Sequence, residues 1–205
     1  DEALAEWYRT NDYPTLWTGA DDAARREALL GALETAADHG LPVLRYDAAA
    51  LRVALLEART EGDRGRAEVA LSRAYLAWAH DLTSGAIVPA NVDPGILREI
   101  EVIDPGVLLS RMAAGEPRVV LDWLVPKSPA YMNLMKAKIG LEAVIADGGW
   151  GEPVTASSLA LGESGAEVVK LRDRLVRMGY LAPTATASYY RSIETAVLDF
   201  QVNHG

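Results

Sequence analysis

Apolar residues recur along most of this chain at intervals of three and four, the spacing of one face of an α-helix. The clearest case is residues 66–84, which Gly85 ends. Its apolar stripe comprises Ala67, Leu71, Ala74, Tyr75, Trp78 and Leu82. No segment alternates apolar and polar residues well enough to predict a strand. The pattern therefore predicts an all-α protein.

The same spacing predicts two helices before residue 60. One covers about 21–39 and stops at Gly40, and the other covers about 47–59 with Asp47 as its N-cap. The residues expected to face inward on the first are Leu29, Leu30, Leu33 and Ala37. The aromatic cluster before them comprises Trp7, Tyr8, Tyr13 and Trp17, with Pro14 inside it. Because aromatic side chains bury large areas, we expect this cluster to fill a core rather than bind a ligand.

Four prolines then mark places where helices can begin, since proline is favoured in the first helical turn. Three of them follow an Asp or Ser that can act as the N-cap. The predicted helices cover about 94–100, 105–113, 117–124 and 129–147. The last is ended by Gly148-Gly149, where the composition changes to Gly, Pro, Ser and Thr. We therefore place a helical domain at 1–152, a linker near 154–158 and a smaller domain at 158–205.

The smaller domain is predicted to contain two helices. The first runs from about 166 to 178 after the turn at 162–165, and Gly179 ends it. Its apolar face comprises Val168, Leu171, Leu175 and Met178. Ser192 can cap the second, whose shared face comprises Ile193, Val197, Phe200 and His204. Two short helices with facing apolar stripes form a very small core.

This arrangement of turn glycines and helix faces resembles a peptidoglycan-binding module. The matching residues are Leu159, Gly162, Gly165, Val168, Leu171, Arg174, Leu175, Gly179, Tyr180, Ala196, Val197, Phe200, Gln201 and Gly205. The Asp-Gly turn that the family has between the helices is replaced by residues 183–187, and the segment that follows Gly205 in the family is absent. We therefore expect a C-terminally incomplete module. Its Val197 and Phe200 are then partly exposed, mobile or buried in self-association.

Residues 1–152 resemble the scaffold domain of the large L,D-transpeptidases of Gram-negative bacteria. One group of matching residues is the aromatic cluster with Pro14, followed by Ala37, His39, Gly40, Leu41, Pro42 and Tyr46. The other groups are Leu71, Tyr75, Asp81, Leu82, Gly85 and Pro89, and then Leu124, Pro126, Pro129, Tyr131, Leu134, Gly148, Gly149 and Trp150. In that family a helical scaffold is followed by a peptidoglycan-binding module and a catalytic domain. The order of the two parts here agrees with this.

Charge and composition exclude several classes of partner and chemistry. The net charge of −9 disfavours nucleic acid and anionic membranes, and no apolar run approaches the roughly 20 residues of a membrane span. The chain has 205 residues and no cysteine, which excludes disulfides and a thiolate nucleophile. His39, His80 and His204 are not at metal-ligand spacing, so we predict neither a metal site nor a cofactor. The N-terminus carries no signal peptide, although the family resemblance implies export to the periplasm.

The resemblance implies a parent enzyme that crosslinks peptidoglycan stem peptides through a cysteine acyl-enzyme. Without cysteine this chain cannot build that site, so we predict no catalytic residues and no transpeptidation by this chain alone. The catalytic domain of the parent is then one expected partner. Glu163-Ser164 is similar to the Glu-Ser pair of lytic transglycosylases, but a general acid there needs a desolvated cleft.

Glycan binding requires an exposed aromatic ring with hydrogen-bonding neighbours. The candidates in the smaller domain are Tyr180, Tyr189, Tyr190, Arg191 and Gln201. Arg191 is also suited to pair with stem-peptide carboxylates. Alternatively, Tyr180 and one of the two adjacent tyrosines close the small core.

The sequence thus predicts a non-catalytic scaffold that positions a cell-wall L,D-transpeptidase on peptidoglycan. The alternative is a protein–protein interaction scaffold of the cell envelope without glycan binding. A surface formed by Tyr189 and Tyr190 favours the first hypothesis, and a large apolar patch on the scaffold favours the second.

Overall fold

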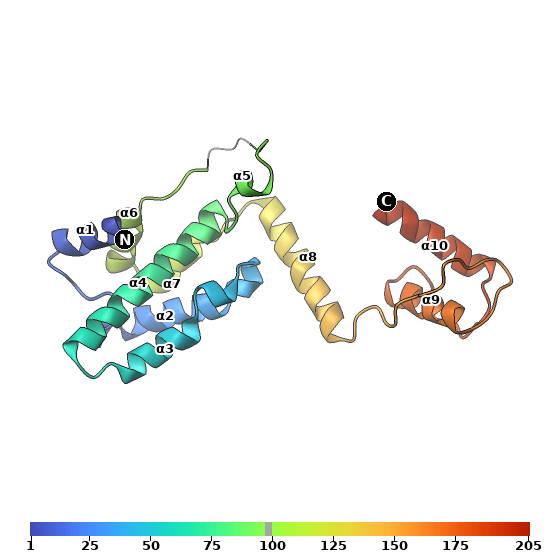
Figure 1. Ribbon diagram of the computed structural model, residues 1–205, viewed down its shortest axis with the longest axis horizontal. Coiled ribbons are helices and arrows are strands. Elements are labelled where there is room, and N and C mark those ends of the chain that lie inside the picture. The colour runs from blue at the N-terminus through green and yellow to red at the C-terminus, as the bar shows by residue number, and fades with distance from the viewer. Residues whose placement is uncertain (97–99) are drawn as a thin grey trace. The chain divides into compact units, whose positions relative to one another are not determined.

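The computed structural model describes residues 1–96 and 100–205 (Figure 1). Within these ranges the chain forms ten α-helices and no strand, which confirms the all-α prediction. No helix in them has the length and hydropathy to cross a membrane. The helix predicted over 94–100 includes residues 97–99, which lie outside the described residues. The chain divides into two compact units, Asp1–Met135 (unit 1) and Lys136–Gly205 (unit 2).

Unit 1 is a bundle of helices joined by short turns. Its α-helices are α1 (Glu2–Thr10), α2 (Ala23–Glu34), α3 (Ala48–Glu57), α4 (Glu61–Ser84), α5 (Pro89–Val92), α6 (Pro105–Ala114), α7 (Pro117–Leu124) and the start of α8 (Pro129–Ala146). Its 3₁₀ turns are Ala20–Asp22, Ala36–His39 and Val43–Arg45. The helices predicted from prolines 105, 117 and 129 are confirmed to within one residue at each end. The Glu116 carboxylate also acts as an N-cap, accepting a hydrogen bond from the Val119 amide at 2.8 Å.

Helix α4 begins five residues earlier than the periodicity predicted. Thr60 Oγ1 accepts a hydrogen bond from the Asp63 amide at 3.1 Å, and Asp63 accepts one from the Thr60 amide at 2.8 Å. This reciprocal pair is a capping box, which satisfies two of the amide groups that a helix N-terminus leaves unpaired. Gly62 and Gly65, which ordinarily weaken a helix, lie inside it.

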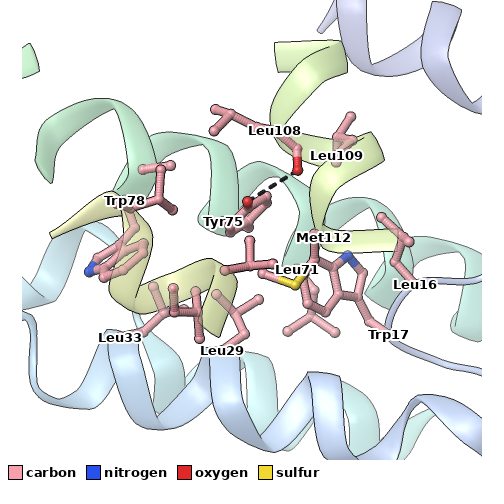
Figure 2. Packing of buried hydrophobic residues seen from close by; sticks show 14 of the residues in the cluster. Leu16, Trp17, Leu29, Leu33, Leu71, Tyr75, Trp78, Leu108, Leu109 and Met112 are labelled. Atoms are coloured by element: carbon pink, nitrogen blue, oxygen red, sulfur yellow. Dashed lines mark hydrogen bonds between the residues drawn. The ribbon is translucent and has the colours of Figure 1, made fainter. Parts of the chain in front are cut away.

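The core of unit 1 forms around one side of α4. Figure 2 shows the side chains of Leu71, Tyr75 and Trp78 from α4 packed with leucines of α2 and with residues of α6. The Tyr75 hydroxyl donates a hydrogen bond to the Leu108 carbonyl oxygen at 3.2 Å, so this buried polar group is satisfied. Burial raises the pKa of Tyr75 well above its usual range.

Two predicted core positions are wrong. Ala37 is exposed and Ala36 is buried in its place, because α2 ends at Glu34 and the following 3₁₀ turn changes which residue faces inward. Tyr13 is 69% exposed, whereas its neighbours Trp7 and Trp17 are buried as expected.

A buried carboxylate joins the N-terminal segment to α4. Glu68 Oε1 accepts hydrogen bonds from the Tyr8 hydroxyl at 2.7 Å and the Leu16 amide at 2.6 Å. Glu68 Oε2 accepts from the Trp17 amide at 3.2 Å, the Thr18 amide at 2.9 Å and the Thr18 hydroxyl at 2.8 Å. Burial raises the pKa of Tyr8 far above its usual range, so Tyr8 remains a donor at neutral pH. Five donors on one carboxylate fix the segment that connects α1 to α2.

Unit 2 contains the rest of α8 and two further helices, α9 (Ala166–Arg177) and α10 (Arg191–His204). The predicted helix at 166–178 is confirmed, and Gly179 has a φ of +82° as expected after a helix. The Ser192 cap is wrong, because α10 begins at Arg191 with Tyr190 in the N-cap position. The buried core comprises Val168, Leu175, Tyr189, Ile193 and Ala196. Val197 and Phe200 are half-buried against it, and self-association through them stays a prediction.

We predict that Glu68→Ala lowers the free energy of unfolding of unit 1 by about 3 kcal/mol or more, because it leaves buried amides without an acceptor. Urea unfolding followed by tryptophan fluorescence measures this, since four of the five tryptophans lie in unit 1. Glu57→Ala, at an exposed helix end, is the control and should change stability by less than about 0.5 kcal/mol. Equal midpoints for the two variants would contradict the assigned role of Glu68.

Candidate functional site

The two helices of unit 2 start from a pair of antiparallel loop segments. The Gly162 amide donates to the Tyr189 carbonyl at 3.0 Å, and the Tyr189 amide donates to the Glu163 carbonyl at 2.7 Å. The hydroxyls of Ser164 and Ser188 lie 2.6 Å apart across the same pairing. Residue 165 caps α9 and residue 190 caps α10, both without a side-chain hydrogen bond. The pairing therefore brings both helix N-termini to one region of unit 2.

The adjacent tyrosines lie in opposite environments. Tyr189 is only 7% exposed and belongs to the core of unit 2, where burial raises the pKa of its hydroxyl and the nearby Glu194 carboxylate adds to the effect. Tyr190 is 58% exposed. Successive residues of an extended segment point to opposite sides, so burying one ring exposes the other. Only Tyr190 of this pair offers a ring to a ligand.

Arg191 is exposed in the first turn of α10. Within the described part of the chain it has no ion pair, and the carboxylate in its own turn, Glu194, does not reach it. A helix N-terminus carries partial positive charge, which favours anions there and disfavours a cation by a few tenths of a kcal/mol to about 1 kcal/mol. An anion bound at this end of α10 would satisfy the guanidinium and the helix together.

The remaining two candidates lie toward the other end of α10. The Tyr180 ring packs edge-on against Phe200, with centroids 5.6 Å apart, and its hydroxyl is 3.2 Å from His204 Nε2. Gln201 is exposed in the last turns of α10, ten residues from Arg191 and hence about 15 Å along the helix. The structure therefore brings together Tyr190 and Arg191, but does not bring Gln201 to them.

Glu163 lies in the turn before α9 and is exposed. Its Oε2 accepts a hydrogen bond from the Ala160 amide at 2.9 Å, which closes the turn. A glycosidase acid needs a desolvated site, and this carboxyl has none. The described residues also contain no cluster of three His, Asp or Glu side chains suited to a metal ion.

Sequence reasoning missed the residues that hold the linker. Glu167 Oε2 accepts hydrogen bonds from the Thr155 amide at 2.6 Å and the Ala156 amide at 3.2 Å, and Lys170 donates to its Oε1 at 2.7 Å. The Lys170 ammonium, followed by these amides, lowers the pKa of Glu167 to about 2. The linker near 154–158, predicted from its composition alone, is thus attached to the first turn of α9.

Two arginines continue this attachment along α9. Arg174 donates to the Gly151 carbonyl at 3.0 Å, and Arg177 donates to the Gly149 carbonyl at 3.2 Å. Together with Glu167 they recur at helical spacing on one face of α9, which is the only signal of this role in the sequence. The segment from residue 148 to 156 is therefore a fixed part of unit 2.

We predict that the amide proton chemical shifts of Thr155 and Ala156 report the ionisation of the Glu167 carboxyl. The pKa of Glu167 is depressed from 4.5 to about 2 in the folded chain, so this attachment is fully present above pH 4.5 and is lost as pH falls toward 2. Their amide proton shifts should stay constant from pH 7 to about 4 and move below it. Glu167→Gln should abolish that step and speed amide exchange at both residues roughly tenfold. Asp199→Asn, on the exposed side of α10, should change neither property. A step unchanged in Glu167→Gln would contradict the assignment.

A family model described as a scaffold domain matches residues 2–137 of the chain. That range covers more than half of the chain and includes nearly all of unit 1. It ends before α9 and α10, so it does not reach Tyr190 or Arg191. No curated protein matches the chain.

Proposed function

The chain belongs to the scaffold-domain family, and we propose that it is the non-catalytic scaffold and peptidoglycan-binding region of a periplasmic cell-wall L,D-transpeptidase. In this proposal the chain positions a separate catalytic domain that crosslinks peptidoglycan stem peptides. The absence of cysteine supports a non-catalytic role, because the crosslinking chemistry needs a thiolate. Tyr190 and Arg191 are assigned as the contact with peptidoglycan.

The observation that carries the proposal is the exposed Arg191 in the first turn of α10, without an ion pair in the described chain. Stem peptides carry carboxylates, and a guanidinium pairs with a carboxylate through two parallel hydrogen bonds. The free amides at the start of α10 favour the same anion. This arrangement costs local stability in the free protein and is relieved by a carboxylate ligand.

Tyr190 supplies the complementary contact. Its ring is more than half exposed beside Arg191, so one face is available to pack on the apolar face of a sugar. The hydroxyls of Ser164 and Ser188 lie on the neighbouring loop pairing and can exchange hydrogen bonds with sugar hydroxyls. An aromatic ring, a cation and hydroxyls together suit a glycan with acidic peptide branches.

One observation favours the alternative of a scaffold that docks another protein. Helix α8 has two opposite apolar sides, one with Leu134, Leu141 and Ile145 and the other with Met132 and Ile139. Each of these side chains is more than half exposed. A helix that is apolar on opposite sides is usually covered on both, and a catalytic domain or another envelope protein could provide the cover. This function does not require the Tyr190 surface.

The test is a pull-down of the chain with purified insoluble peptidoglycan sacculi. We expect the double variant Tyr190→Ala/Arg191→Ala to bind about tenfold more weakly, which corresponds to the loss of one aromatic and one charged contact. Leu198→Ala is the matched control, because Leu198 is 56% exposed elsewhere on α10. Tyr189→Ala is unsuitable, since it removes a core ring and weakens the fold of unit 2.

Equal binding by the double variant and the wild type would overturn the assignment of Tyr190 and Arg191. Absence of binding by a folded wild-type chain would overturn glycan binding itself and favour the protein-docking alternative. Circular dichroism of each variant establishes that the helices are intact.

A further inference from the structure

Unit 1 has a hollow of about 720 Å³ beside the N-terminal half of α4. Its walls come from α1, the segment that joins α1 to α2, and the first half of α4. Tyr8, Thr18 and Glu68 are among the residues that line it. Because Glu68 already accepts five hydrogen bonds, its carboxylate does not compete for a ligand. Volumes of this size are typical of ligand pockets.

Tyr13 lies at this hollow in a strained backbone conformation. Its φ is +52° and that of Asp12 is +59°, a region that residues other than glycine rarely adopt. Such a residue costs of order 1 kcal/mol or more, and the Tyr13 amide, which donates to the Tyr8 carbonyl at 2.8 Å, helps to hold it. The ring gains no core packing in return, because it is 69% exposed. The strain therefore presents an aromatic ring to solvent beside the hollow.

Gly65 lies on the α4 wall of the same hollow. A glycine inside a helix costs about 0.5–1 kcal/mol relative to alanine. The fold does not require it, because a Cβ built at Gly65 would meet no atom within 4 Å. The absent side chain instead keeps this wall open to whatever enters the hollow.

The charged lining of the hollow is mixed. Arg9, Arg64 and Arg73 line it together with Asp1 and Glu61, the carboxylates that pair with Arg73 and Arg64. Their ion pairs are with exposed carboxylates; for Arg64 and Glu61 the exposed fractions are 50% and 88%. Exposed pairs of this kind contribute at most about 1 kcal/mol, so a ligand carboxylate can replace one of them.

We propose that this hollow is a second contact for peptidoglycan, in which a sugar ring packs on Tyr13 and a stem-peptide carboxylate pairs with Arg64 or Arg9. In naming peptidoglycan as the ligand, the inference rests on the proposed function. In this inference the scaffold domain binds peptidoglycan in addition to positioning the catalytic domain. A polymer held at two sites on one chain is retained more strongly than at either site alone.

The test uses a soluble disaccharide-peptide released from purified sacculi by a muramidase, titrated into the ¹⁵N-labelled chain. We expect the amide signals of Tyr13 and Gly65 to shift. Gly65→Gln should abolish these shifts, because its side chain fills the hollow while glutamine favours the helix. Gly65→Ala is the control and should bind normally.

Tyr13→Gly separates binding from folding. It relieves the positive φ, so the variant should be at least as stable as the wild type, but it removes the ring and should weaken binding about tenfold. Unchanged binding in Tyr13→Gly or in Gly65→Gln would overturn the inference. Equal shifts with the free stem peptide, which lacks the sugars, would overturn the role of Tyr13 as a sugar contact.

The same titration distinguishes this inference from the proposed function. Shifts at Gly65 that persist in Tyr190→Ala/Arg191→Ala support an independent site in unit 1. Shifts at Tyr190 without shifts at Gly65 overturn the hollow and leave the proposed function in place. Shifts at neither site in a folded chain overturn both.

Discussion

The buried Glu68 carboxylate is the constraint on which unit 1 depends. Its two oxygens accept hydrogen bonds from the backbone or side chains of Tyr8, Leu16, Trp17 and Thr18, which are 50 or more residues earlier in the chain. Buried amides need acceptors, so the segment between α1 and α2 can pack on α4 only in this one register. That register puts Trp17 into the core beside α4 and leaves the turn before it, including Tyr13, at the surface. The hollow is formed by the same attachment.

Periodicity predicted the helices well wherever apolar residues decide their packing. It identified α4 from its apolar stripe, whereas α6, α7 and α8 were predicted from their prolines. It could not predict the role of Glu68, because a glutamate next to an apolar stripe is ordinarily solvated. The partners of that carboxylate are amides of a distant segment, and no local pattern in α4 reports where they lie. The early start of α4 was missed for a different reason, since a capping box outweighed two glycines.

The candidate site was only partly predictable from the same kind of pattern. Two adjacent tyrosines before a helix predict that one ring is buried and the other exposed. This agrees with the alternative that one of the two adjacent tyrosines closes the small core. Which ring is buried depends on the pairing of residues 162–165 with 187–189, which sets the side toward which Tyr189 points. Gln201 and Arg191 share a helix, yet ten residues of rise separate them. Both residue types suit glycan binding, but their positions on α10 keep the two side chains apart.

At the two proposed contacts, Tyr13, Gly65 and Arg191 depart from what folding alone favours, and all three are exposed. Tyr13 has a positive φ, Gly65 weakens a helix without a packing reason, and Arg191 opposes the dipole of α10. None of these three features stabilises the fold, whose buried carboxylate Glu68 is already satisfied by five donors. Local preferences that are violated without compensation inside the protein are expected where a ligand supplies the compensation. Tyr13 and Gly65 lie inside the matched scaffold domain and Arg191 lies outside it, so the two proposed contacts belong to different parts of the chain and do not depend on each other.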